Sequence, residues 1–260
     1  MRCRPAILGL ALSAMLVTRC FDIEQTIDLK KDMSGTAGVR IGVDFEPMVT
    51  IMAQMAHDMS GKKGPATSEE IEKAKADFRK QQSEKKGDDQ EIASALQKKL
   101  PQGITLLDSA VTNRDFGVVS TFHFAFDRLS QLVGLELPSE NSDPTKKSPI
   151  STPFASLEVV ETADKVTIRT RPQNPADSVK QEASAKSPTN PEMEKMMRDA
   201  FKKMRIAYRI TAPFRVLSAN ATRREGNTLI WEFDFDRMEK LAKAGSSTTA
   251  ESGVSVTYHK

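Results

Sequence analysis

Apolar residues recur at every second position in several stretches of this chain, and this alternation is the feature that most constrains its fold. Between 22 and 29, Ile23, Ile27 and Leu29 alternate with charged or polar residues. A second alternating run covers 39–45 and follows a turn-forming segment of lysine, aspartate, serine and glycine. Because strand side chains point to opposite faces in turn, the two runs predict half-buried strands joined as an antiparallel hairpin.

Alternation returns further along the chain, together with apolar residues at helical spacing. The later predicted strands lie within 103–126, 154–171, 205–211, 214–223, 228–235 and 253–259. The predicted helices begin near 47 and 68, and others cover 88–100, 127–134, 190–204 and 236–244. This mixture predicts an α+β fold with an antiparallel sheet.

The stretch 61–100 differs from its surroundings because it is densely charged. Ser68 and Glu70 resemble a capping box, in which a hydroxyl and a carboxylate satisfy the first amides of a helix. We therefore expect a helix to begin at Ser68. A protruding hairpin made of this helix and the predicted helix at 88–100 would fit this composition, and so would a partly disordered charged linker over 61–87.

One short phrase occurs twice in the sequence. Phe124–Leu129 and Phe233–Met238 share it, and Val43–Met48 is a looser third copy. In each copy a strand ends on an aromatic residue, and an acidic residue follows where the positive end of a helix favours it. We therefore expect two or three repeated β-hairpin-plus-helix units in one sheet, with Asp127 and Asp236 as helix caps rather than catalytic groups.

These patterns divide the chain into segments. They are a signal peptide at 1–19, an N-terminal hairpin and helix at 20–60, a charged helical insert at 61–100, a central β-rich unit at 101–172, a flexible linker at 173–190 and a C-terminal α+β unit at 191–260. The linker is assigned from its low apolar content, which leaves it little surface to bury.

The N-terminal segment has the order of a secretory signal peptide. Arg2 and Arg4 give a positive start, and residues 5–18 are almost wholly apolar. This run is shorter than the roughly 20 residues that a membrane-spanning helix needs. Residues 16–20, Leu-Val-Thr-Arg-Cys, resemble the lipobox of bacterial lipoproteins, in which the cysteine becomes the lipidated first residue. Cys20 is therefore the predicted lipidation site, and a membrane is the predicted partner.

Two other interpretations of this segment remain, an ordinary secreted protein and an uncleaved N-terminal tether. Arg19 stands where a lipobox has a small residue. Lipidation is favoured because Cys3 and Cys20 are the only cysteines, so a mature chain that starts at Cys20 has no internal disulfide to form. The predicted location is the bacterial cell envelope, with the chain held at a membrane and facing the periplasm or the exterior.

The charge balance argues against one large class of partner. The chain has 38 lysine and arginine residues against 35 aspartate and glutamate residues, and loss of the three arginines of the signal makes the numbers equal. Nucleic-acid binding needs a concentrated basic surface that displaces counterions. We therefore expect no nucleic-acid partner.

Methionines cluster on two of the predicted helices and define the candidate binding site. The set is Met48, Met52, Met55, Met193, Met196, Met197 and Met204. Because methionine is flexible and polarizable, such clusters suit an apolar groove for an acyl chain or an amphipathic peptide. Two helices that cover a sheet, with methionine filling irregular space, would give the same pattern.

Motifs of familiar catalytic and metal sites are missing from the sequence. His57, His123 and His259 have no second histidine or carboxylate at metal-ligand spacing. Neither a glycine-rich phosphate loop nor a Gly-x-Ser-x-Gly turn occurs. His57 is placed on the polar side of its helix. We expect no catalytic residue, no metal and no cofactor, and a protein that is not an enzyme.

Short motifs in the C-terminal part are similar to those of LppM-like envelope lipoproteins. They are Pro213-Phe214-Arg215-Val216, Asn220-Ala221, Gly226-Asn227-Thr228 and Trp231. They accompany a lipobox-like cysteine that leads directly into a hairpin, so the resemblance covers the signal region and residues 205–235. It implies an α+β protein of unassigned function that is tied to the cell surface.

The sequence thus favours an exported, lipid-anchored envelope protein that acts as a non-enzymatic binding or scaffold module for an envelope protein. A carrier of a lipid or other apolar ligand in the methionine-lined groove is an alternative. A hydrolase with carboxylates brought together by the fold is a second alternative, because such a site needs no local motif.

Overall fold

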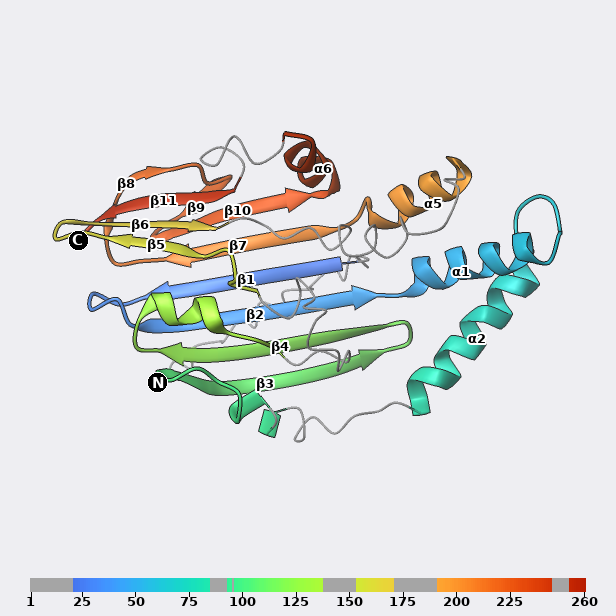
Figure 1. Cartoon of the computed structure of the whole chain (residues 1–260), viewed down its shortest axis with the longest axis horizontal. Coiled ribbons are helices and arrows are strands. Elements are labelled where there is room, and N and C mark those ends of the chain that lie inside the picture. Colours follow the sequence, from blue (N-terminus) through green and yellow to red (C-terminus); the bar gives the residue numbers. More distant parts are fainter. Residues whose placement is uncertain (1–20, 85–92, 95, 138–152, 171–190, 245–252) are drawn as a thin grey trace, which may run out of the picture.

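A computed structural model describes residues 21–84, 93–94, 96–137, 153–170, 191–244 and 253–260. Within these residues the chain folds into two β-sheets accompanied by a few helices (Figure 1). The predicted α+β class is confirmed. The predicted signal peptide, Cys20 and the linker at 173–190 lie outside the described residues.

The larger sheet has seven strands in the order β3-β4-β2-β1-β7-β10-β9. Their bounds are β1 Phe21–Leu29, β2 Gly35–Asp44, β3 Ile104–Arg114, β4 Gly117–Phe126, β7 Arg205–Thr211, β9 Arg223–Glu225 and β10 Thr228–Asp234. β1 and β2 form the predicted antiparallel hairpin, with Ile23 opposite Ile41. Alternation in the sequence therefore located this hairpin correctly.

One neighbouring pair in the larger sheet is parallel, so the prediction of an antiparallel sheet is wrong at that point. β1 pairs with β7, and Ile23 lies opposite Ile206. The chain reaches β7 through helix α5 (Pro191–Phe201), which ends where β1 begins (Figure 1). β7 consequently starts beside the start of β1. Alternation specifies which face of a strand is buried but not the direction of its neighbour.

The smaller sheet has four strands in the order β5-β6-β11-β8. Their bounds are β5 Glu158–Glu161, β6 Lys165–Thr170, β8 Arg215–Ala219 and β11 Val254–His259. The predicted single strand over 214–223 is in fact divided into β8 and β9, which belong to different sheets. Asn220 lies at this division. Its side-chain oxygen accepts hydrogen bonds from Trp231 Nε1 at 2.7 Å and from the Ser255 backbone N–H at 2.9 Å, which joins the two sheets.

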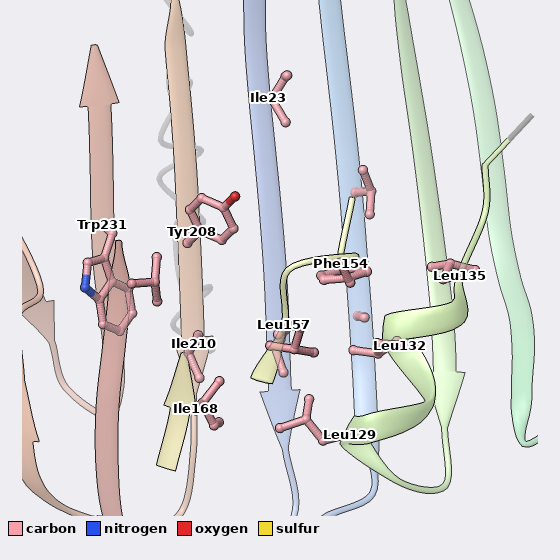
Figure 2. Packing of buried hydrophobic residues seen from close by; sticks show 14 of the residues in the cluster. Ile23, Leu129, Leu132, Leu135, Phe154, Leu157, Ile168, Tyr208, Ile210 and Trp231 are labelled. Carbon is pink, nitrogen blue, oxygen red and sulfur yellow. The ribbon is translucent and has the colours of Figure 1, made fainter. Parts of the chain in front are cut away.

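The core contains the inward side chains of both sheets and of the 3₁₀ helix η1 (Leu129–Gly134). Figure 2 shows Leu132 of η1 lying with Phe154 and Leu157 over the inner face of the larger sheet. Trp231 is completely buried, at 0% exposure. The alternating apolar residues of β1, β2, β4, β7 and β10 therefore point to one shared core.

The opposite face of the larger sheet carries an ion-pair network centred on Arg205. Its guanidinium donates to Asp22 at 3.0 Å, to Glu24 at 3.0 Å and to Glu232 at 3.2 Å. Arg40 also donates to Asp22. Burial opposes ionisation of Asp22, but the hydrogen bonds from Arg205 and Arg40 outweigh it and hold the pKa of Asp22 below its usual value. The network thus links β2, β1, β7 and β10.

The two clear copies of the repeated phrase lead into different structures, and repeated hairpin-plus-helix units are not confirmed. β4 leads into η1, whose Leu129 is buried in the core, whereas β10 leads into the α-helix α6 (Phe235–Ala244). Asp234 accepts a hydrogen bond from the Arg237 backbone N–H at 2.8 Å. The capping carboxylate of α6 is therefore Asp234 rather than the predicted Asp236.

Helices α1 (Glu46–Met59) and α2 (Ser68–Glu84) form a hairpin that projects from one end of the larger sheet, and α5 lies beside α1 there (Figure 1). We call the α1–α2 hairpin the arm, and the end of the sheet where β1 starts and β2 stops the helical end. The C-terminus lies at the other end of the sheet (Figure 1). Within the described ranges, the helices are too short or too polar to cross a membrane.

Candidate binding surface at the helical end

One side of α1 exposes methionine side chains. Met52, Met55 and Met59 are 62%, 45% and 86% exposed, and Met48 is half-buried. Spacings of four, three and four residues place these side chains on one side of an α-helix. We call Met48, Met52, Met55 and Met59 the methionine face. Contiguous exposed apolar side chains, unlike scattered ones, mark contact sites.

The opposite side of α1 is buried against α2. Val49, Ala53 and His57 follow one another at four-residue spacing, and all are buried. His57 Nδ1 lies 2.8 Å from Glu70 Oε2 of α2, so the polar side on which the sequence places His57 is the side that packs on α2. The imidazole is enclosed because Glu70 supplies a partner for Nδ1 between the helices. His57 Nε2 is buried and has no hydrogen-bond partner in the part of the chain that is described.

Glu70 joins the start of α2 to the end of α1. Besides its contact with His57, it accepts hydrogen bonds from Lys62 Nζ at 2.7 Å and from the Thr67 backbone N–H at 2.9 Å. These partners, Lys62 first, lower the pKa of Glu70 to about 2. The Thr67 hydroxyl accepts in return from the Glu70 backbone N–H at 3.3 Å. The capping box therefore has Thr67 as its first member, one residue before the predicted Ser68.

A second set of contacts holds the far end of α2. Lys75 Nζ donates to Glu46 Oε1 of α1 at 2.8 Å. Phe78 packs on Phe45, with ring centroids 5.6 Å apart, and on Phe116 in the β3–β4 turn, at 6.3 Å. α2 is thus docked both on α1 and on the sheet. This part of the charged stretch forms a folded element, and the alternative of a disordered linker does not apply to α2.

The other methionines of the predicted groove belong to α5 or follow it. Met196 is half-buried on α5, which contacts α1. Met204 is 2% exposed and belongs to the core. The side chains of Met193 and Met197 lie outside what the structure describes. The structure therefore places Met196 on a helix that contacts α1 and turns Met204 inward, and a ligand-holding groove stays a prediction.

The chain enters the sheet at the helical end, beside the start of α1. Phe21 is paired with Val43, three residues before α1 begins. Its ring stacks on Phe201 at the end of α5, with centroids 5.5 Å apart, and Phe201 packs on Phe235 at the start of α6, at 6.5 Å. Cys20 immediately precedes Phe21 in the sequence. The segment before β1 therefore joins the fold at the end that carries the methionine face.

A few other titratable side chains lie away from the helical end. His123 Nδ1 is 3.6 Å from Asp108 Oδ2, and both side chains are exposed. Burial raises the pKa of Tyr208 and of Tyr258. Among the described residues, no three or more histidine, cysteine, aspartate or glutamate side chains are grouped so that they could hold a metal ion. The expected absence of catalysis stays a prediction.

Several residues of this surface and its support were missing from the sequence-based site. Met59 continues the spacing of the other methionines on α1 and could have been included on that ground. Thr67 and Glu70 show the i, i+3 spacing of a capping box. The contact of His57 with Glu70 joins two helices, and no fixed sequence spacing predicts it.

Comparisons with known proteins give little guidance. The sequence matches no protein family, and it matches no curated protein. Among solved structures, the chain is similar to the folded domain of LppM from Mycobacterium tuberculosis, determined by NMR. The two share 11% sequence identity over 93% of this chain and 90% of that chain, with a TM-score of 0.42. This likeness is weak and leaves the family of the chain open.

Proposed function

We propose that this chain is an exported protein of the bacterial cell envelope, anchored by a lipid on Cys20, and that it acts as a non-enzymatic binding or scaffold module. Its contact surface is the methionine face of α1. One observation carries this proposal: the exposed side of α1 is apolar, while its other side is fixed to α2.

Burial of the exposed methionines would supply binding free energy. Full removal of one methionine side chain from water contributes about 1.5–3 kcal/mol. Met52, Met55 and Met59 are all exposed and lie next to one another on the helix. Because methionine adapts its shape, such a face also tolerates partners of varied contour. The face therefore has the chemistry of a contact site.

The arm is ordered before any partner arrives. Glu70 holds its tip through His57 and Lys62, and Lys75 and Phe78 hold its base. A preformed surface avoids the entropy cost of ordering a flexible segment on binding. This organisation supports a role in recognition rather than a role as a passive linker.

The lipid anchor is tested with Cys20→Ser. In the wild-type chain we expect fractionation with membranes, and mass spectrometry should find an acylated N-terminal cysteine. Cys20→Ser should move the protein to the soluble fraction. A wild-type chain with an unmodified Cys20, or a variant that fractionates as the wild type does, would show that this part of the proposal is wrong.

The contact surface is tested with the double variant Met52→Asp and Met55→Asp. Cross-linking in cells should join the wild-type chain reproducibly to whatever contacts the methionine face. The double variant should not give this cross-linked product. Leu217→Asp is the matched control, because Leu217 is also an exposed apolar residue, 41% exposed, but lies on β8. An undiminished product in the double variant would exclude the methionine face as the contact surface.

A second candidate function is the carriage of an apolar ligand between α1 and α5. The contact between these helices favours it, as does the half-buried state of Met48 and Met196. Native mass spectrometry of the purified chain provides the test. A lipid that co-purifies with the wild type and is lost in Met196→Asp would support this candidate, whereas a bare chain would exclude it.

A further inference from the structure

The helical end combines the methionine face with two exposed lysines that follow α5, Lys202 and Lys203. Between 195 and 203, at the end of α5 and just after it, four basic residues accompany the single acidic residue Asp199. Arg198 is paired with Glu239, at 2.7 Å. Lys202 and Lys203 are exposed and directly follow Phe201, whose ring stacks on Phe21. Positive charge is thus placed where the chain enters the sheet.

The arm itself has two chemically different sides. The methionine face lies on the side of α1 opposite the residues that contact α2. α2 exposes charged side chains, including Glu69, Glu72, Lys73 and Asp77. The pair of helices is therefore amphipathic as a unit, with an apolar side formed by α1 and a charged side formed by α2. Helices with this division lie in the interface of a bilayer with their apolar side inward.

From these placements we propose that the methionine face, together with Lys202 and Lys203, is a membrane-contact surface that lies on an anionic bilayer. This inference rests on the proposed function, since it names the partner of the same surface. α2 then faces the water, and the two lysines hold the helical end against the lipid headgroups. Each lysine near such a surface strengthens binding roughly fivefold.

A bilayer fits this surface better than a second protein because of where the anchor is attached. α1 has 14 residues and is about 21 Å long. The methionine face therefore begins five residues after Val43, the strand partner of Phe21, and Phe21 is the residue that follows Cys20. A chain tethered at that point meets the bilayer at a high effective concentration, so even a modest apolar face remains in contact.

The experiment places a photoreactive benzophenone residue at Met52 in the full chain. The chain is reconstituted into vesicles of phosphatidylglycerol and phosphatidylcholine and then irradiated. Lipid adducts at position 52 should exceed those at position 217 severalfold, where the same residue replaces Leu217 on β8. Lys202→Ala with Lys203→Ala should lower the yield at 52 severalfold. Vesicles of phosphatidylcholine alone should lower it as well.

Three results would overturn the inference. The first is the absence of lipid adducts at 52 in chains that are bound to vesicles. The second is an equal yield at 52 and 217, which would indicate contact without orientation. The third is an adduct at 52 between two copies of the chain in place of lipid, which would make a second copy the occupant. Circular dichroism of each variant verifies that the fold is retained.

The design separates failure of this inference from failure of the lipid anchor. Mass spectrometry of the N-terminal peptide reports whether Cys20 is acylated. If it is not, the unmodified thiol of Cys20 is coupled to a maleimide-bearing lipid of the vesicles, so the chain is still held there and the adducts at 52 can be measured. Adducts at 52 with an unmodified Cys20 would support the contact surface and refute the anchor. An acylated Cys20 without adducts at 52 would support the anchor and refute the contact surface.

Discussion

The two-sheet body and the α1–α2 arm differ in where their polar and apolar side chains lie. In the body, the buried indole of Trp231 has a hydrogen-bond partner in Asn220, and Arg205 is surrounded by carboxylates. In the arm, the polar contacts lie between the helices, and methionines lie on the outside. The body thus has the organisation of a stable scaffold, and the arm has the organisation of a contact element.

The body and the arm should also contribute differently to the stability of the protein. Side chains of the core are excluded from water by both sheets and by η1. The arm touches the rest of the chain mainly through its base and through α5. Regions with fewer buried contacts open locally at a lower free energy than the core. Changes in the body should therefore unfold the whole protein, whereas changes in the arm should act locally.

Trp231→Ala should have the largest effect. It removes a fully buried ring from the centre of the core and leaves Asn220 without the indole donor. We expect a loss of about 3–5 kcal/mol in the free energy of unfolding, measured by urea denaturation. Leu217→Ala, at an exposed position, should change it by less than about 0.5 kcal/mol. Similar values for the two variants would contradict the assignment of the core.

Arg205→Met should have the next largest effect. It leaves Asp22, Glu24 and Glu232 next to one another without their shared cation. Because Arg205 is partly buried, we expect a loss of about 2 kcal/mol by the same measurement. Arg223→Met provides the control, since that side chain is half exposed and should contribute less than about 1 kcal/mol. Equal losses of unfolding free energy in the two variants would show that Arg205 contributes no more to stability than the more exposed Arg223.

Glu70→Gln should loosen the arm and leave the body folded. The folded-state pKa of Glu70 is lowered from 4.5 to about 2, so its carboxylate stabilises the arm above about pH 4.5. That stabilisation is lost as the pH falls from 4.5 towards 2. NMR of the α2 amides should show this transition in the wild type but not in Glu70→Gln.

Glu69→Gln is the matched control for the arm. Glu69 is the exposed neighbour of Glu70, and its variant should keep the transition of the α2 amides. If Glu70→Gln also kept it, another group would be responsible. If the amides of β1 and β7 changed in Glu70→Gln at neutral pH, the arm and the body would form one cooperative unit.

Met52→Asp with Met55→Asp should have the smallest effect on folding. Both side chains are exposed, so the free energy of unfolding should change by no more than about 0.5 kcal/mol for each substitution. The protection of Met59 from oxidation by anionic vesicles should nevertheless be lost, as measured by peptide mass spectrometry. A large loss of stability would mean that the methionine face packs within the protein.

The sequence predicted the parts of the fold that depend on local pattern. Alternation located β1, β2, β7 and β10, and helical spacing located α1 and α5 within a few residues. The repeated phrase around Phe126 and Phe235 marked two strand ends but not the type of helix after each strand. Both helices bury the equivalent residue in the core, Leu129 in η1 and Met238 in α6, so neither the phrase nor this burial distinguishes a 3₁₀ helix from an α-helix.

Features that depend on distant partners could not be predicted in this way. The parallel pairing of β1 with β7 joins residues such as Ile23 and Ile206, which are far apart in the chain. The division between β8 and β9 depends on Asn220, which is bonded to strands of both sheets. The methionine face was visible in the spacing on α1, but its exposure is known only once α2 occupies the other side.

Methionine oxidation of the wild-type chain tests the central claim most directly. Chloramine T, a charged oxidant, converts accessible methionines to the sulfoxide, and peptide mass spectrometry measures the extent at each position. With anionic vesicles present, Met52, Met55 and Met59 should be protected relative to vesicle-free protein, while the buried Met204 stays unreactive in both states. Equal oxidation of Met52 and Met55 with and without vesicles would contradict the account.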